Sequence, residues 1–177
     1  MKIFLICFIF ILITSLSFCQ ETGVLIDERD GKSYKTVCLN GVVWMAENLA
    51  FKPENGNCWA YDNDCENVKG YGLLYDWKTS YKVCPPGWRL PNNEEFNQLI
   101  ELNSNGFNFV KGGYRYSSGE YFYLGVEGFW WSSTIYDDEG SIVLYYGLIF
   151  GGNEELSVSH GFGPRNAHSV RCVKEQK

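Results

Sequence analysis

The sequence lacks most of the residue patterns that catalysis and metal binding require. Its 177 residues include only two histidines, His160 and His168, and no serine stands in a Gly-x-Ser-x-Gly context. No Cys-x-x-Cys pair occurs, and neither histidine has a cysteine partner at zinc-finger spacing. Because a nucleophile needs a base and an orienting group, we expect a non-enzymatic protein without cofactor or metal.

A hydrophobic run long enough to cross a bilayer is also missing. The apolar run from Ile3 to Ile13 is too short to span a membrane, but with its flanks it suits a secretory signal peptide over residues 1–19. Cleavage after Cys19 would leave a single domain over residues 20–177. The alternative is a lipid anchor on Cys19, although Phe18 is bulky for the position before a lipidated cysteine. We therefore expect a secreted or outer-surface protein with no transmembrane segment in the mature chain.

Positive charge is scarce. The chain has 15 Lys and Arg against 21 Asp and Glu, a net charge of -6, and removal of residues 1–19 takes away Lys2 and no acid, which gives -7. An acidic surface argues against nucleic acid and anionic lipid as partners. Glycans and proteins remain open as partners.

Aromatic residues and glycine, in contrast, are plentiful. Aromatics make up 17% of the chain and there are 19 glycines, a composition that favours short strands and many turns. The turn signals Asp30-Gly31 and Asn40-Gly41 predict a three-strand meander from Val24. Beyond Gly106 the sequence predicts four or five more short strands, the last of which carries Cys172.

Two helices are expected between these regions. Leu74, Trp77, Tyr81 and Cys84 recur at helical spacing and predict a first helix that ends at Cys84, before Pro85 and Pro86. Asn92 followed by Glu95 is a capping box, which predicts a second helix over 93–102. The fold class is therefore α+β, with two helices packed on short antiparallel strands.

Five cysteines remain after export, and in an oxidising compartment they are expected to pair. Cys58 and Cys65 enclose a short polar loop that is typical of a local bridge. Cys84 and Cys172 would then join the middle of the chain to its end. Cys38 is left over, and we expect a buried free thiol there.

The motifs as a set resemble a known family. In chain order they are DERDGKSYKTVCLNGVVWMAENL, CWAYDNDC, YGLLYDW, CPPGWRLP, GGYR, FWWSST and SVRCVK. They are similar to the Fibrobacter succinogenes major paralogous domain family, and the order of helices and cysteines resembles a C-type-lectin-like domain. The resemblance implies an exported, often lipid-anchored bacterial protein with no established enzymatic activity, a bridge from Cys84 to Cys172 and long loops.

The calcium motifs of sugar-binding C-type lectins are not found. Pro53-Glu54-Asn55 precedes both predicted helices instead of lying in the late long loop, so we expect no calcium site there. The acidic stretch from Asp62 to Glu66 lacks the glycine and the closing glutamate of an EF-hand and is expected to be a solvated loop. Of Trp130 and Trp131, one is expected to face the core and the other could face a ligand.

Tyrosine-rich loops after the second helix are the best candidate for a binding surface. In lectin-like folds such loops form one exposed surface, opposite the paired termini. Tyrosine and serine supply rigid contact area and adaptable hydrogen bonds, as recognition loops do. We expect a calcium-independent contact surface for a glycan or a protein, formed by Tyr116, Glu120, Tyr121, Tyr123, Tyr136 and Asp137.

Two other functions stay open from the sequence. The first is a structural or assembly protein of the cell envelope, whose aromatic loops contact another protein. The second is a polysaccharide hydrolase, in which Glu154 and Glu155 would imitate a glycosidase pair, although adjacent strand residues point apart.

Overall fold

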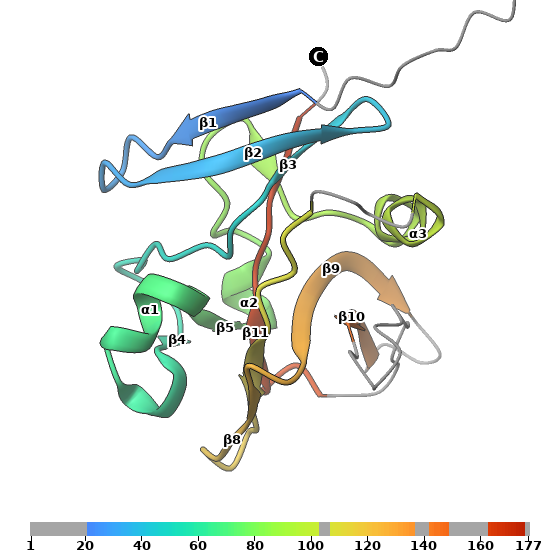
Figure 1. Cartoon of the computed structure of the whole chain (residues 1–177). Helices are drawn as coiled ribbons and strands as arrows, with labels where there is room; N and C mark the ends of the chain where they lie inside the picture. Colours follow the sequence, from blue (N-terminus) through green and yellow to red (C-terminus); the bar gives the residue numbers. More distant parts are fainter. Residues whose placement is uncertain (1–20, 103–106, 137–141, 149–162, 176–177) are drawn as a thin grey trace, which may run out of the picture.

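The computed structural model of the chain describes residues 21–102, 107–136, 142–148 and 163–175. This part of the chain is α+β, mostly sheet, with few helices and one disulfide. In Figure 1 the first strands and the C-terminal end lie together at the top, and β8 lies at the bottom. The predicted signal peptide, residues 1–19, lies outside the described residues, and no described helix is long and apolar enough to cross a membrane.

The predicted meander is confirmed. It consists of β1 (Thr22–Ile26), β2 (Ser33–Leu39) and β3 (Val42–Met45), each antiparallel to the next. Asn40 and Gly41 both have positive φ, 50° and 80°, as a two-residue hairpin turn requires. The sheet order is β1-β2-β3-β12-β6, completed by β12 (Val173–Lys174) and β6 (Trp88–Arg89).

The second sheet has the order β10-β9-β7-β11-β5-β4, and β8 pairs with β7. Its strands are β4 (Cys58–Trp59), β5 (Leu74–Asp76), β7 (Gly112–Arg115), β8 (Tyr121–Leu124), β9 (Gly128–Tyr136), β10 (Ile142–Leu148) and β11 (Ala167–Ser169). After Gly106 the described residues form six strands, one more than the upper bound of the prediction. The predicted last strand is divided into β11 and β12, and Cys172 lies just before β12.

The second predicted helix is confirmed as α3 (Asn93–Glu101). Asn92 Oδ1 accepts from the Glu95 backbone nitrogen at 2.9 Å, and Glu95 Oε2 accepts from the Asn92 backbone nitrogen at 2.8 Å. Phe96 and Leu99 are buried in one cluster with Trp44 of β3. The apolar side of α3 therefore covers one face of the first sheet.

The first predicted helix is wrong over most of its length. Leu74–Asp76 is β5, and only Trp77–Ser80 is helical, as the single turn α2. Leu74 is buried in a cluster with Tyr61 and Ala167, and Tyr75 is buried in the main core cluster, so the apolar residues mark a strand that is covered on both faces. Asp76 Oδ1 accepts from the Thr79 nitrogen at 2.9 Å and starts α2. The 3-10 turn η1 (Tyr61–Asn63) and the helix α1 (Glu66–Tyr71) precede β5.

The long-range disulfide is confirmed and the local one is wrong. Cys84 and Cys172 are bonded, with their Cα atoms 5.9 Å apart. Cys58 and Cys65 are free, since the Cys58 side chain packs on the main core cluster whereas Cys65 is exposed just before α1. Cys38 is free as expected, but it is half-buried rather than buried.

Trp130 and Trp131 are both buried, so the expectation that one could face a ligand is wrong. Trp131 belongs to the main core cluster with Tyr75 and Val170, whereas Trp130 belongs to the cluster under α3. Neighbours on a strand point to opposite faces, and both faces of β9 are covered at this point.

Asn48 and Arg171 form a buried polar centre between the two sheets. Asn48 Oδ1 accepts from Trp130 Nε1 at 2.8 Å and from Arg171 Nε at 3.0 Å. Asn48 Nδ2 lies within hydrogen-bond distance of three acceptors, Tyr71 O, Val110 O and Ser169 Oγ. One side chain thus joins five segments of the chain.

Candidate functional site

The β7–β8 hairpin is the most aromatic exposed element among the described residues. Arg115 pairs with Tyr121 across the hairpin, and the Tyr116 nitrogen donates to the Glu120 carbonyl at 2.8 Å to close the loop between them. A Cβ on Gly113, whose φ is +60°, would collide with the Phe122 carbonyl, so glycine permits this pairing. The hairpin end lies opposite the termini (Figure 1).

The structure places four of the six predicted contact residues on this hairpin. Tyr116 and Glu120 are exposed in its loop, Tyr121 is half-buried and Tyr123 is 48% exposed. Tyr121 lies on the side of η1, where its hydroxyl donates to Asn63 Oδ1 at 3.0 Å. Tyr123 lies on the other side, with its ring centroid 6.0 Å from that of Tyr114.

The other two predicted contact residues are not part of this hairpin. Tyr136 is the last residue of β9, and Figure 1 shows that end of β9 well apart from β8. Asp137 lies outside the described residues. Tyr136 therefore belongs to a different strand from the hairpin residues.

Tyr123 has an unusual backbone conformation. Its φ is +66°, in the left-handed region that bulky side chains seldom occupy. Its carbonyl accepts from the nitrogens of Val126 and Glu127, both at 3.0 Å, so the turn after β8 depends on this conformation. Asparagine or glycine would adopt it at lower conformational cost, yet the sequence has an exposed tyrosine there.

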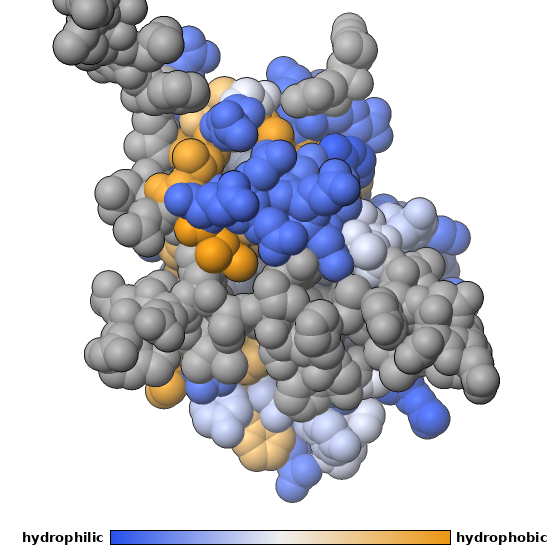
Figure 2. Space-filling view, turned by 90° about the vertical axis from the view of Figure 1, so that its right-hand side faces the viewer, coloured by the Kyte–Doolittle hydropathy of each residue, from blue (hydrophilic) through white to orange (hydrophobic). Residues whose placement is uncertain are grey.

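Sequence reasoning missed two exposed apolar residues and one cation at the same end. Phe122 and Val126 are exposed beside Tyr123. The Arg115 guanidinium carbon lies 4.4 Å from the centroid of the Trp59 ring and 5.8 Å from that of Tyr121. In Figure 2 the lower end of the molecule, at the level of β8 in Figure 1, shows apolar colour beside hydrophilic residues. The pairing of Arg115 with Tyr121 was foreseeable from the turn between them, whereas the contact with Trp59 was not.

The turn of the hairpin is fixed from the second sheet. Asn166, just before β11, is buried, and its Oδ1 accepts from the Ser117 nitrogen at 3.0 Å. Ser118 Oγ donates to Glu120 Oε2 at 2.7 Å within the loop. Burial raises the pKa of the Tyr114 phenol in β7, so this ring stays uncharged at neutral pH. The loop therefore presents its rings from a supported backbone.

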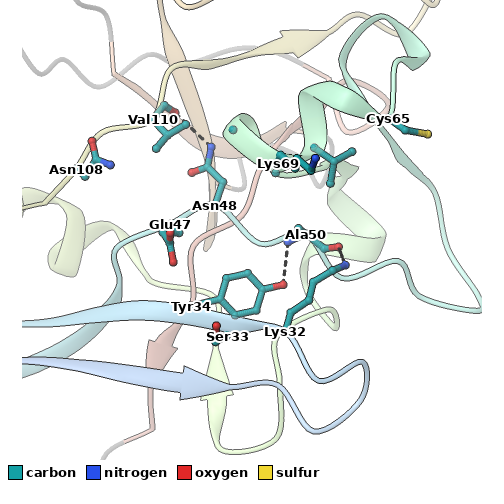
Figure 3. Close-up of a pocket in the computed structure, with 13 residues that line it drawn as sticks. Lys32, Ser33, Tyr34, Glu47, Asn48, Ala50, Cys65, Lys69, Asn108 and Val110 are labelled. Atoms are coloured by element: carbon teal, nitrogen blue, oxygen red, sulfur yellow. Dashed lines mark hydrogen bonds between the residues drawn. The ribbon is translucent and has the colours of Figure 1, made fainter.

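A separate hollow of about 560 Å³ lies between β2 and α1 (Figure 3). Most of its polar groups already have protein partners: Lys32 Nζ donates to the Ala50 carbonyl at 2.6 Å, and the Tyr34 hydroxyl accepts from the Ala50 nitrogen at 3.2 Å. Burial raises the pKa of Tyr34 to about 12, so its hydroxyl stays protonated. Glu47 Oε2 accepts from the Lys35 nitrogen at 2.7 Å. These contacts within the protein occupy part of the polar lining of the hollow.

Histidine, cysteine and carboxylate side chains are the groups that catalysis or metal binding would use. His168 is fully buried, and burial lowers its pKa to about 3, so it is neutral at pH 7. No group of three His, Cys, Asp or Glu residues in the described ranges could hold a metal ion. His160, Glu154 and Glu155 lie outside those ranges.

Comparison with known proteins finds a family model that matches part of the chain. Residues 37–104 match the family model of the Fibrobacter succinogenes major domain, which supports the family named by the sequence motifs. No curated protein and no solved structure matches the chain. The matched part runs from β2 to the end of α3 and excludes the β7–β8 hairpin, so the family match does not bear on the hairpin.

Proposed function

We propose that this protein is an exported, non-enzymatic binding module of the bacterial cell surface with a C-type-lectin-like fold. Its β7–β8 hairpin contacts a glycan or a protein without calcium. The aromatic residues of the contact are Tyr116, Tyr121 and Tyr123, and Glu120 adds a hydrogen-bond acceptor.

Tyr123 is the observation that carries this proposal. A bulky residue at φ +66° costs conformational energy, and such strain persists where the side chain has another use. The ring is 48% exposed, so core packing accounts for only part of its environment. A side chain that contacts a partner would explain why tyrosine stands where glycine or asparagine fits better.

The rest of the fold supports this role. Disulfides such as Cys84–Cys172 form and persist mainly in oxidising compartments, so this bond supports export. The hairpin lies at the end opposite the termini, so a chain held at a surface through its N-terminal end would direct the hairpin outward (Figure 1). A lipid on Cys19 or a free secreted chain both fit this orientation.

A glycan array and a pull-down from the bacterial surface fraction test the proposal on the same purified protein. We expect a partner whose binding falls at least about tenfold in Tyr123→Gly, a change that suits the backbone and removes the ring. The matched control is Tyr81→Gly, which removes another exposed tyrosine, on the loop after α2. If every partner binds Tyr123→Gly as tightly as the original protein, the hairpin is not the contact surface. Polysaccharide degradation that stops in a His160 or Glu154 variant would instead establish the hydrolase alternative.

A further inference from the structure

Arg115 differs from the paired arginines of the protein. Arg29 and Arg89 each lie 2.7 Å from a carboxylate, those of Asp27 and Glu95. Arg115 forms no ion pair with any described residue, and its one hydrogen bond there is a 3.4 Å contact from Nη1 to the Tyr116 carbonyl. Its guanidinium is instead stacked on the Trp59 ring.

The surroundings of Arg115 favour an anion at its terminal nitrogens. The guanidinium is held over Trp59 and near Tyr121, which fixes its orientation through cation–π contacts. Its Nε is buried without an acceptor among the described residues. Folding has already removed part of the water around this cation. A carboxylate is therefore attracted to Arg115 more strongly than to a fully hydrated arginine.

A saccharide fits this setting better than a simple anion does. The half-buried ring of Tyr121 lies on the same face of the hairpin as the cation, whereas Phe122 and Tyr123 lie on the other face beside Tyr114. A flat apolar ring suits the face of a pyranose sugar. The Ser118–Glu120 hydrogen-bonded pair in the loop can bond sugar hydroxyls. A uronic acid residue offers a ring face, hydroxyls and a carboxylate in one unit.

We propose, as a refinement that rests on the function proposed above, that the hairpin binds an acidic saccharide and that Arg115 contacts its carboxylate. The guanidinium donates two N–H groups to the carboxylate oxygens, and the Tyr121 ring contacts the sugar ring. Glu120 accepts a hydrogen bond from a sugar hydroxyl. Its negative charge disfavours the binding of polyanions that lack a sugar ring.

Tetragalacturonate and its methyl ester test the carboxylate directly, because the two have the same sugar rings and differ in charge. By titration calorimetry at low ionic strength we expect the acid to bind roughly ten- to a hundredfold more tightly than the ester. Arg115→Gln should abolish this preference, and Arg115→Lys should keep part of it. Glu120→Gln should raise the affinity for the acid severalfold, while Lys69→Gln, which changes an exposed cation on α1, should leave it unchanged.

Equal affinity for acid and ester, or no binding of the acid, would overturn this proposal. Tetraglutamate that binds as tightly as tetragalacturonate would overturn the saccharide part and indicate an acidic peptide. Melting curves of each variant show whether a loss of affinity reflects unfolding. Glu120→Gln tests the preference for an acidic ligand while Arg115 is kept. The function proposed above survives if a neutral glycan or a protein binds through Tyr123, and it fails as well if no partner responds to Tyr123→Gly.

Discussion

Two arginines stacked on aromatic rings have opposite environments in this protein. Arg171 is fully buried, with its guanidinium carbon 4.4 Å from the Phe107 ring centroid, and it donates to the Asn48 side chain and to the Asn108 carbonyl. Arg115 stacks on Trp59 at the same distance but is half-exposed and has a single long hydrogen bond among the described residues.

The difference separates a structural cation from a candidate binding cation. Burial lowers the pKa of Arg171 to about 9, so it is still charged at neutral pH and depends on its acceptors. Arg115 has unused donors at the surface. We therefore expect changes near Arg171 to alter stability, and changes on the hairpin to alter binding with little effect on stability.

The largest effect on stability is expected from the disulfide that ends next to Arg171. Replacement of Cys84 and Cys172 by serine releases a bond that spans 88 residues, and we expect a loss of about 4 kcal/mol in the free energy of unfolding. Urea denaturation measures it. The control is Cys58→Ser with Cys65→Ser, which should lose much less because both thiols are free. Non-reducing peptide mapping that recovers a Cys58–Cys65 bridge would contradict the structure.

Asn48→Ala is expected to be the next most damaging change. It would leave the Arg171 Nε and Trp130 Nε1 donors buried without their acceptor, at a cost of about 3 kcal/mol. Asn55→Ala, at an exposed position, is the control and should stay within about 0.5 kcal/mol of the original protein. Thermal or urea unfolding compares the two. Equal stability of both variants would mean that the Asn48–Arg171 centre is not structural.

The elements that the sequence predicted correctly have local signals. Asn40-Gly41 fixes the turn of the meander because both residues have positive φ, and the Asn92–Glu95 capping box starts α3. The segment from Leu74 to Asp76 failed because its apolar spacing fits a helix as well as a strand buried on both faces. Only pairing with β4 and β11 decides between them, and that pairing is not local.

The candidate site likewise has a part that follows from the local sequence and a part that depends on distant contacts. Tyr116, Glu120, Tyr121 and Tyr123 are close in the sequence, and the structure places all four on one hairpin. Trp59 comes from a strand more than fifty residues earlier, and its contact with Arg115 depends on how β4, β5 and β11 pair. The positive φ of Tyr123 could not be predicted either, because a single sequence carries no signal for it.

A smaller, pH-dependent effect is expected at the start of α3. Burial raises the pKa of Glu95, but hydrogen bonds from Arg89 and the Asn92 nitrogen outweigh it, so the pKa lies below the ordinary 4.5. This carboxylate therefore stabilises the fold above pH 4.5, and its contribution is lost as the pH falls through the lowered pKa. Glu95→Gln should cost about 1 kcal/mol at pH 7 and progressively less in acid. The exposed neighbour variant Glu94→Gln is the control and should stay within about 0.5 kcal/mol of the original protein at pH 7. A constant Glu95→Gln cost down to pH 2 would contradict the assignment.

The smallest change in stability is expected at Tyr123. Its size tests whether the hairpin near Arg115 contributes less to stability than the buried surroundings of Arg171. Glycine relieves the left-handed strain at φ +66° but has more freedom in the unfolded chain and loses ring contacts, so Tyr123→Gly should stay within about 1 kcal/mol of the original protein. Tyr123→Asn keeps a side chain that tolerates this conformation and should be at least as stable as Tyr123→Gly. Tyr123→Ala, which suits φ +66° less well, should be the least stable of the three. If all three variants instead melt far below the original protein, the Tyr123 ring is part of the core, as the buried tryptophans of β9 are. The strain at Tyr123 would then no longer support a binding role for the hairpin.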